Sequence, residues 1–146
     1  MQRLDGQLVL SPTDLTHHQE CAHLTRLDLG VAMGEWAAPD VETPEDVQFV
    51  FDRGLEHERK YLASLKGAGK TVVEIAGGSG ANGRRRAEAE TVEAMRRGAD
   101  VVYQGTVFDG AWGGQADFLL RVDTPSPVTT WMYSGSTPCS TVSRSA

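Results

Sequence analysis

The sequence has few cysteines and no long apolar run. Two cysteines, Cys21 and Cys139, are too few for a disulfide framework or a closed zinc site, which needs four ligands in close pairs. No apolar run approaches the roughly 18 residues that would span a bilayer, and the first residues lack a signal-peptide pattern. We therefore expect a cytoplasmic protein with no membrane attachment.

Positive charge is also scarce. The chain has 14 Lys and Arg residues against 20 Asp and Glu residues, which gives a formal net charge of -6. Because cationic side chains drive duplex binding by displacing condensed counterions, nucleic-acid binding over the whole surface is not expected. Arg84, Arg85 and Arg86 form a local cluster and are the predicted contacts to a DNA backbone. The alternative is a solvated helix end, balanced by Glu88 and Glu90.

Local signals predict several helices within one domain. Ser11 before Pro12 is an N-cap signal that begins a helix, and Thr43 before Pro44 repeats the signal ahead of the longest helix. An exposed helix is predicted from about Arg84 to Arg97, with Val92 and Met95 as its thin apolar side. This last helix is expected to cover a sheet.

The helix after Pro44 is predicted to bury one face. Its stripe, with spacings of three and four, consists of Val47, Phe51, Leu55, Glu58, Leu62 and Leu65. His57 belongs to the adjoining row, so His57 and Glu58 are predicted to lie on or beside the buried face. A buried carboxylate or imidazole is costly unless it is paired, hydrogen-bonded or bound to a cation. The alternative is a satisfied polar pair at the edge of the core.

The second half of the chain predicts a β-hairpin. The apolar segments 101–108 and 115–122 flank Asp109 and Gly110, a tight-turn signal. In the period-two pattern Asp117 points to the face opposite Phe118, within a strand apolar enough to be central. An acid there is a candidate functional residue, and a solvent-facing position is the alternative.

Three segments in this order resemble the RecB-like nucleases of the PD-(D/E)XK superfamily. They are Ser11–Leu15 leading to Cys21, Gly54–Glu58 in the long helix, and Gly113–Asp117 in the hairpin. The resemblance covers residues 7 to 123 or so. It implies an α/β (α+β) fold, a restriction-endonuclease-like core of a mixed sheet flanked by helices, incomplete at its C-terminus. It also implies a DNA nuclease of the exonuclease, repair or recombination type.

The resemblance further implies a metal site. The family's helical histidine matches His57 and its strand aspartate matches Asp117, so these two are the predicted ligands of Mg²⁺ or Mn²⁺, with Glu58 as a third catalytic candidate. Such hard ions choose oxygen ligands and activate bound water. The implied partners are DNA, single-stranded or at an end, and a helicase. The iron–sulfur cluster of some family members needs four cysteines and is not expected.

The chain departs from the family at the catalytic motif. The family has a further strand with an acid-x-Lys motif, whereas no acid or lysine follows Asp123. Residues 1–123 are therefore interpreted as the N-terminal part of a nuclease domain, and 124–146 as an irregular Ser/Thr-rich tail, disordered or produced by a frame shift near Tyr133. Little or no cleavage is predicted. The alternative function is a catalytically dead module that binds nucleic acid or a helicase.

Overall fold

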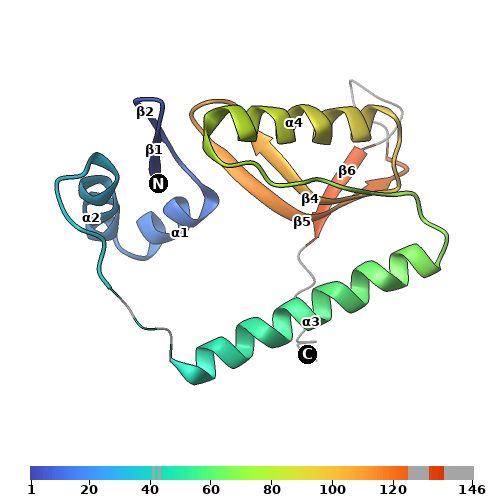
Figure 1. The fold of residues 1–146 in the computed structure, drawn as a ribbon, viewed down its shortest axis with the longest axis horizontal. Helices are drawn as coiled ribbons and strands as arrows, with labels where there is room; N and C mark the ends of the chain where they lie inside the picture. The colour runs from blue at the N-terminus through green and yellow to red at the C-terminus, as the bar shows by residue number, and fades with distance from the viewer. Residues whose placement is uncertain (41, 43, 125–131, 137–146) are drawn as a thin grey trace.

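The computed structural model describes residues 1–40, 42, 44–124 and 132–136 and combines helices with two sheets (Figure 1). Its elements are β1 (Gln2–Leu4), β2 (Gln7–Val9), α1 (Pro12–Glu20), α2 (Ala22–Met33), α3 (Glu45–Gly67), β3 (Val72–Glu74), α4 (Gly80–Arg96), β4 (Val101–Phe108), β5 (Gly113–Val122) and β6 (Met132–Ser136). The predicted α/β class is confirmed. Within these described ranges, no helix combines the length and the apolar content that crossing a membrane requires.

The larger sheet has the strand order β3-β4-β5-β6. β3 runs parallel to β4, whereas the β4–β5 and β5–β6 pairs are antiparallel. Helix α4 connects the parallel pair, because parallel neighbours need a crossover connection. β4 and β5 form the predicted hairpin. Its turn is closed by Asp109, whose Oδ1 accepts hydrogen bonds from the N–H groups of Ala111 at 2.9 Å and Trp112 at 2.7 Å.

Helix α4 covers one face of this sheet (Figure 1). The buried cluster between them consists of Ile75, Ala87, Ala94, Ala99 and Val102. The helix was predicted to face the core with Val92 and Met95, but its buried residues are Ala81, Ala87, Thr91 and Ala94. The prediction holds for Met95, which is partly buried and packs against this cluster. It missed the small side chains, which allow the helix to lie close to the strands.

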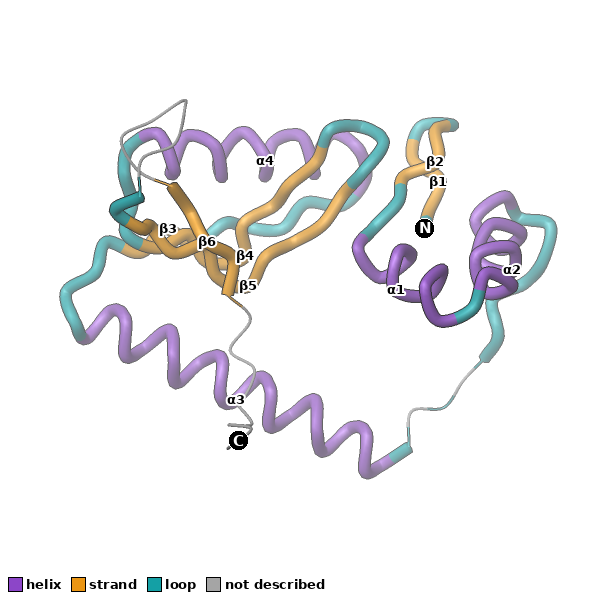
Figure 2. The backbone as a smooth tube through the Cα atoms, turned by 180° about the vertical axis from the view of Figure 1, so that it is seen from behind, coloured by secondary structure: helices purple, strands orange, loops and turns teal. Residues whose placement is uncertain are grey.

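Helix α3 lies on the other side of the sheet (Figures 1 and 2). The ring of Phe118 is completely buried and lies 4.9 Å from the ring of Tyr61 in α3 and 5.2 Å from that of Tyr103 in β4. The first half of α3 is different: Phe51 is 57% exposed, and no residue of the helix is fully buried. The predicted buried stripe is therefore wrong for this half, because a periodic stripe is buried only where another element covers it.

Strand β6 corrects the prediction that segment 124–146 is irregular throughout. Met132–Ser136 pairs with β5 in antiparallel register. The Tyr133 hydroxyl donates a hydrogen bond to the carbonyl of Ala99 at 2.6 Å, and its ring packs against the buried cluster under α4. A strand of this kind needs no apolar period, because backbone pairing with the neighbouring strand holds it. The rest of the predicted tail beyond Thr124, including Cys139, lies outside the described residues.

The N-terminal residues form the hairpin β1–β2 and the helices α1 and α2 (Figure 1). Helix α1 begins at Pro12 as predicted. Asp14 Oδ2 accepts hydrogen bonds from the Ser11 N–H at 2.6 Å and the Ser11 hydroxyl at 2.7 Å. Burial raises the pKa of Asp14, but hydrogen bonds from the N-terminal ammonium group and from Ser11 outweigh it and hold the pKa below its usual value. The carboxylate therefore fixes the first turn of α1.

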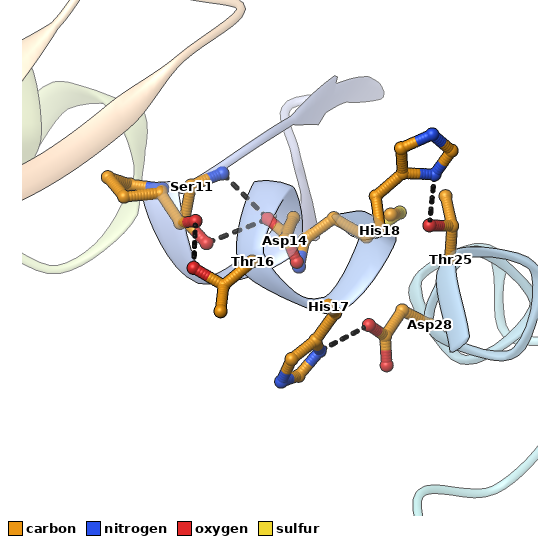
Figure 3. Close-up of polar contacts among 9 residues, drawn as sticks. Ser11, Asp14, Thr16, His17, His18, Thr25 and Asp28 are labelled. Carbon is orange, nitrogen blue, oxygen red and sulfur yellow. Dashed lines mark hydrogen bonds and ion pairs between the residues drawn. The ribbon is translucent and has the colours of Figure 1, made fainter. Parts of the chain in front are cut away.

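Two histidines join α1 to α2 (Figure 3). His17 Nδ1 lies 2.9 Å from Asp28 Oδ2, and His18 Nδ1 lies 2.9 Å from Thr25 Oγ1. The chain is extended at the exposed Cys21 between the two helices. These contacts set the angle between α1 and α2. The segment before α1 is joined to the larger sheet by a hydrogen bond in which the N–H of Gly113 donates to the carbonyl of Leu10 at 2.8 Å.

Candidate active site

A glutamate of α3 and an aspartate of β5 come together on the side of the sheet that faces α3. Glu58 Oε1 accepts hydrogen bonds from the Tyr103 hydroxyl at 2.8 Å and from Gln104 Nε2 at 2.6 Å. The Gln104 side chain also lies close enough to Asp117 to lower its pKa. Gln104 and Tyr103 therefore hold Glu58 from β4, next to Asp117. Glu58 and Asp117 are candidate residues in the sequence, whereas Tyr103 and Gln104 were not predicted.

The backbone of Gln104 makes this arrangement possible. Its φ is 57°, in the left-handed region, in the middle of β4. A non-glycine residue pays about 1–2 kcal/mol for this conformation, and such strain is commonly found at functional sites. The regular β4–β5 pairing is interrupted at the same place, between the pairs Tyr103↔Phe118 and Gly105↔Ala116. The polar Gln104 before Gly105 in an otherwise apolar strand is the sequence feature that could have revealed this distortion.

Asp117 lies opposite Gln104 in the hairpin, because the β4–β5 register is the same on both sides of this position. The strict alternation of a strand predicts that Asp117 and Phe118 face opposite sides. Phe118 packs on Tyr61 of α3, and Asp117 lies close enough to Glu58 of the same helix to be affected by its charge.

Burial and the negative charge of Glu58 raise the pKa of Asp117, while the hydrogen bond from Gln104 acts against them. Burial and the hydrogen bond to Glu58 likewise raise the pKa of the Tyr103 hydroxyl. Two carboxylates close together disfavour each other's ionisation, which is the reason that the charge of Glu58 raises the pKa of Asp117.

His57 lies elsewhere on the helix surface. It was predicted to lie on or beside the buried face, and because its side chain is exposed it does not lie on that face. Consecutive helical residues point about 100° apart, and Glu58 is the one that contacts the sheet. Among the described residues, no three or more His, Cys, Asp or Glu side chains form a group that could hold a metal ion, so His57, Glu58 and Asp117 do not form one.

The predicted arginine cluster separates into three environments. Arg84 is partly buried and lines a cavity beside the N-terminus of α4. Arg85 is exposed. Arg86 is also exposed, and its Nε lies 3.6 Å from Glu90 Oε1 in the next turn. Of these three arginines, Arg84 is therefore the one that lines a cavity.

The family resemblance depends on a small set of residues. No family model, curated protein or solved structure matches the chain. The likeness to RecB-like nucleases therefore rests on Ser11–Leu15 leading to Cys21, on Gly54–Glu58, on Gly113–Asp117 and on their order along the sequence. To these the fold adds the proximity of Glu58 and Asp117. What the resemblance implies about activity is a proposal.

The raised pKa of Asp117 predicts how stability depends on pH. The pKa of Asp117 is higher in the folded state than in the unfolded state. Its contribution to folding stability is therefore fully present at pH values below the unfolded pKa, and it is lost as the pH rises through the folded pKa. Asp117→Asn removes the charge at nearly constant shape. In metal-free buffer at pH 7 the variant is therefore expected to unfold at a higher urea concentration than the wild type. The difference should shrink as pH falls toward 4.

Asp109→Asn is the matched control with the opposite sign. Hydrogen bonds from the N–H groups of Trp112 and Ala111 lower the pKa of Asp109. Its contribution to stability is present above the unfolded pKa and is lost as pH falls through the folded pKa. This variant should unfold at a lower urea concentration than the wild type at pH 7. Equal behaviour of the two variants would contradict the electrostatic assignment of Asp117.

Proposed function

We propose that the chain is part of a metal-dependent DNA nuclease domain, located in the cytoplasm, in which Glu58 and Asp117 bind Mg²⁺ or Mn²⁺. The observation that supports this proposal is that Glu58 of α3, held by the Gln104 amide, lies close enough to Asp117 of β5 for its charge to raise the pKa of the aspartate. Carboxylate oxygens are the ligands that these ions prefer. A cation beside them would offset the repulsion that contributes to the raised pKa of Asp117.

The donor set fits such an ion. Glu58 Oε1 accepts from both Tyr103 and Gln104, and no hydrogen bond to Oε2 is found among the described residues. Mg²⁺ commonly binds through one or two carboxylates and keeps several of its waters, so Glu58 Oε2 and Asp117 would suffice as protein ligands. The ion would supply activation of water and neutralisation of charge on a phosphodiester. Tyr103 and Gln104 are positioning residues, because they orient Glu58.

The chain supplies no lysine to this site. The strand beside β5 is β6, and its residues Met132–Ser136 include neither an acid nor a lysine. No acid or lysine follows Asp123 in the sequence. The resemblance implies that a lysine orients or deprotonates the attacking water. We therefore expect binding of the ion with little or no cleavage by this chain.

Isothermal titration of the whole chain with Mn²⁺ tests the proposal. Glu58→Gln and Asp117→Asn should each lower the affinity for Mn²⁺ at least about tenfold, because even outer-shell changes at metal sites cost that much. Glu56→Gln is the matched control, since Glu56 lies on the same helix but pairs with Lys60 at 2.7 Å. His57→Ala decides the identity of the helical ligand. A loss of Mn²⁺ affinity in His57→Ala as large as that in Glu58→Gln would mean that His57 is a metal ligand, as the family pattern implies.

Incubation with labelled single-stranded DNA and Mn²⁺ tests the expected lack of cleavage. Weak cleavage that disappears in Asp117→Asn would support an enzyme with low residual activity. DNA binding without any Mn²⁺ affinity would instead contradict the metal site. That result would favour the alternative function, a catalytically dead module that binds nucleic acid or a helicase.

A further inference from the structure

A cavity of about 400 Å³ lies where α1, α4 and the β4–β5 hairpin approach one another. Its wall includes the first turn of α1 at Ser11–Thr13, the loop residues Gly77 and Gly78 before α4, and the strand start at Gly113–Gln115. Arg84 and Thr106 also line the cavity. Glu58 and Asp117 do not line it, so the cavity is distinct from the carboxylate pair.

Much of the wall is bare backbone. A Cβ added to Gly78 would lie 2.2 Å from the backbone of Gly83, and one added to Gly114 would lie 3.4 Å from the ring of Pro12. The glycines therefore allow three segments to come close together without side chains between them. At the start of α1 Pro12 has no N–H, the Ser11 N–H donates to Asp14 Oδ2 at 2.6 Å, and the Asp14 N–H donates to the Ser11 carbonyl at 3.1 Å. The Thr13 N–H is therefore the first-turn donor that a ligand could use.

Arg84 gives the cavity a positive charge. Its guanidinium lies against Gly113, where an added Cβ would be 2.9 Å from Nη1. No acidic partner of Arg84 is found among the described residues, in contrast to Arg86, which pairs with Glu90. No Asp or Glu lines the cavity in the described part of the chain. A partly buried guanidinium without an acid favours an anionic ligand.

Thr106 supplies an independent indication of a ligand. Its side chain is only 8% exposed and is part of the cavity wall. Its backbone N–H donates to Thr91 Oγ1 at 2.9 Å, but the Thr106 hydroxyl has no hydrogen-bond partner in the part of the chain that the structure describes. Because buried polar groups are nearly always paired, this hydroxyl indicates that a polar group fills the cavity.

We propose that this cavity binds a phosphate group of a nucleic-acid strand. Arg84 would form charge-assisted hydrogen bonds with its oxygens, and the Thr106 hydroxyl and the Thr13 N–H would donate further ones. Thr106 pairs with Gln115 in the β4–β5 register, two residues along the strands from Gln104 and Asp117. The assignment of the phosphate to a nucleic-acid strand rests on the proposed function, whereas the anion site itself does not.

Two titrations of the whole chain in EDTA test the inference without any metal. The probes are inorganic phosphate, measured by calorimetry, and a short oligothymidylate without terminal phosphates, measured by fluorescence anisotropy. Arg84→Ala is expected to lower the affinity for both probes about tenfold or more, as loss of a charge-assisted hydrogen bond does. Thr106→Val keeps the shape of the side chain and should lower both affinities severalfold. Circular dichroism melting checks that each variant is folded.

Arg85→Ala is the matched comparison, because Arg85 is the exposed neighbour of Arg84. It should change the affinity for phosphate by less than about twofold, since exposed charges contribute little. Equal losses in Arg84→Ala and Arg85→Ala, or no phosphate binding by the wild type, would overturn the site. Phosphate binding that the oligothymidylate does not share would overturn the strand as the source. Failure of Mn²⁺ binding with phosphate binding intact would refute the proposed nuclease function and leave the anion site standing.

Discussion

Phe118→Ala is expected to lower the free energy of unfolding by about 3–5 kcal/mol, the usual cost of removing a buried phenylalanine ring. The Phe118 side chain is completely buried between the rings of Tyr61 in α3 and Tyr103 in β4. Its removal leaves a void where α3 meets the sheet. Because domains of this size have about 5–15 kcal/mol of stability in total, urea denaturation followed by circular dichroism should show a large shift.

Phe51→Ala is the matched control for this change. Phe51 lies on α3 as well, but its side chain is 57% exposed. The same truncation there should change stability by no more than about 0.5 kcal/mol, as most surface substitutions do. Similar losses at both positions would mean that the apolar stripe of α3 is buried along its whole length, as the sequence spacing alone predicts.

Sequence reasoning succeeded where structure depends on neighbouring residues. Helix α1 begins at Pro12 and helix α3 directly after Pro44, as their N-terminal signals predict. The hairpin forms around Asp109 and Gly110 for the same reason, because the aspartate side chain and the glycine conformation close the turn locally. These features need no knowledge of the rest of the fold.

The same reasoning failed where burial depends on a partner surface. The period of α3 correctly groups Phe51 with Leu55, but both are about half exposed, since no described element covers that half of the helix. In α4 the buried row contains Ala87 and Ala94, which carry a weak hydrophobic signal in the sequence. Strand β6 has no apolar alternation, and its segment was therefore predicted to be irregular.

The carboxylate pair illustrates both outcomes. The sequence placed Glu58 and Asp117 among the candidates, and the fold brings them near each other. It could not show that Glu58 rather than His57 faces the strands, because that depends on how α3 is rotated about its axis. Nor could it show the left-handed Gln104, which arises from an interruption in the pairing of two strands. Long-range geometry therefore decides which of the candidate residues form a site.

Gly78→Ala is expected to cost about 1–3 kcal/mol, the range for forcing extra atoms into a packed position. The added Cβ would lie 2.2 Å from the carbonyl carbon and oxygen of Gly83, in the first turns of α4. Both groups belong to the backbone, so neither can rotate away as a side chain would. The loop must then move off the helix. Because Arg84 follows Gly83, the affinity for inorganic phosphate should fall together with the thermal melting midpoint.

Gly77→Ala separates steric contact from loss of loop flexibility. A Cβ at this position would lie 3.8 Å from Gln115 Nε2, an ordinary contact distance. The same glycine-to-alanine change should therefore be neutral or stabilise the protein by up to about 1 kcal/mol, since alanine reduces the entropy of the unfolded chain. Equal losses at Gly77 and Gly78 would mean that the loop needs freedom of movement. A loss confined to Gly78 would show that the close approach of the loop to α4 maintains the wall of the cavity.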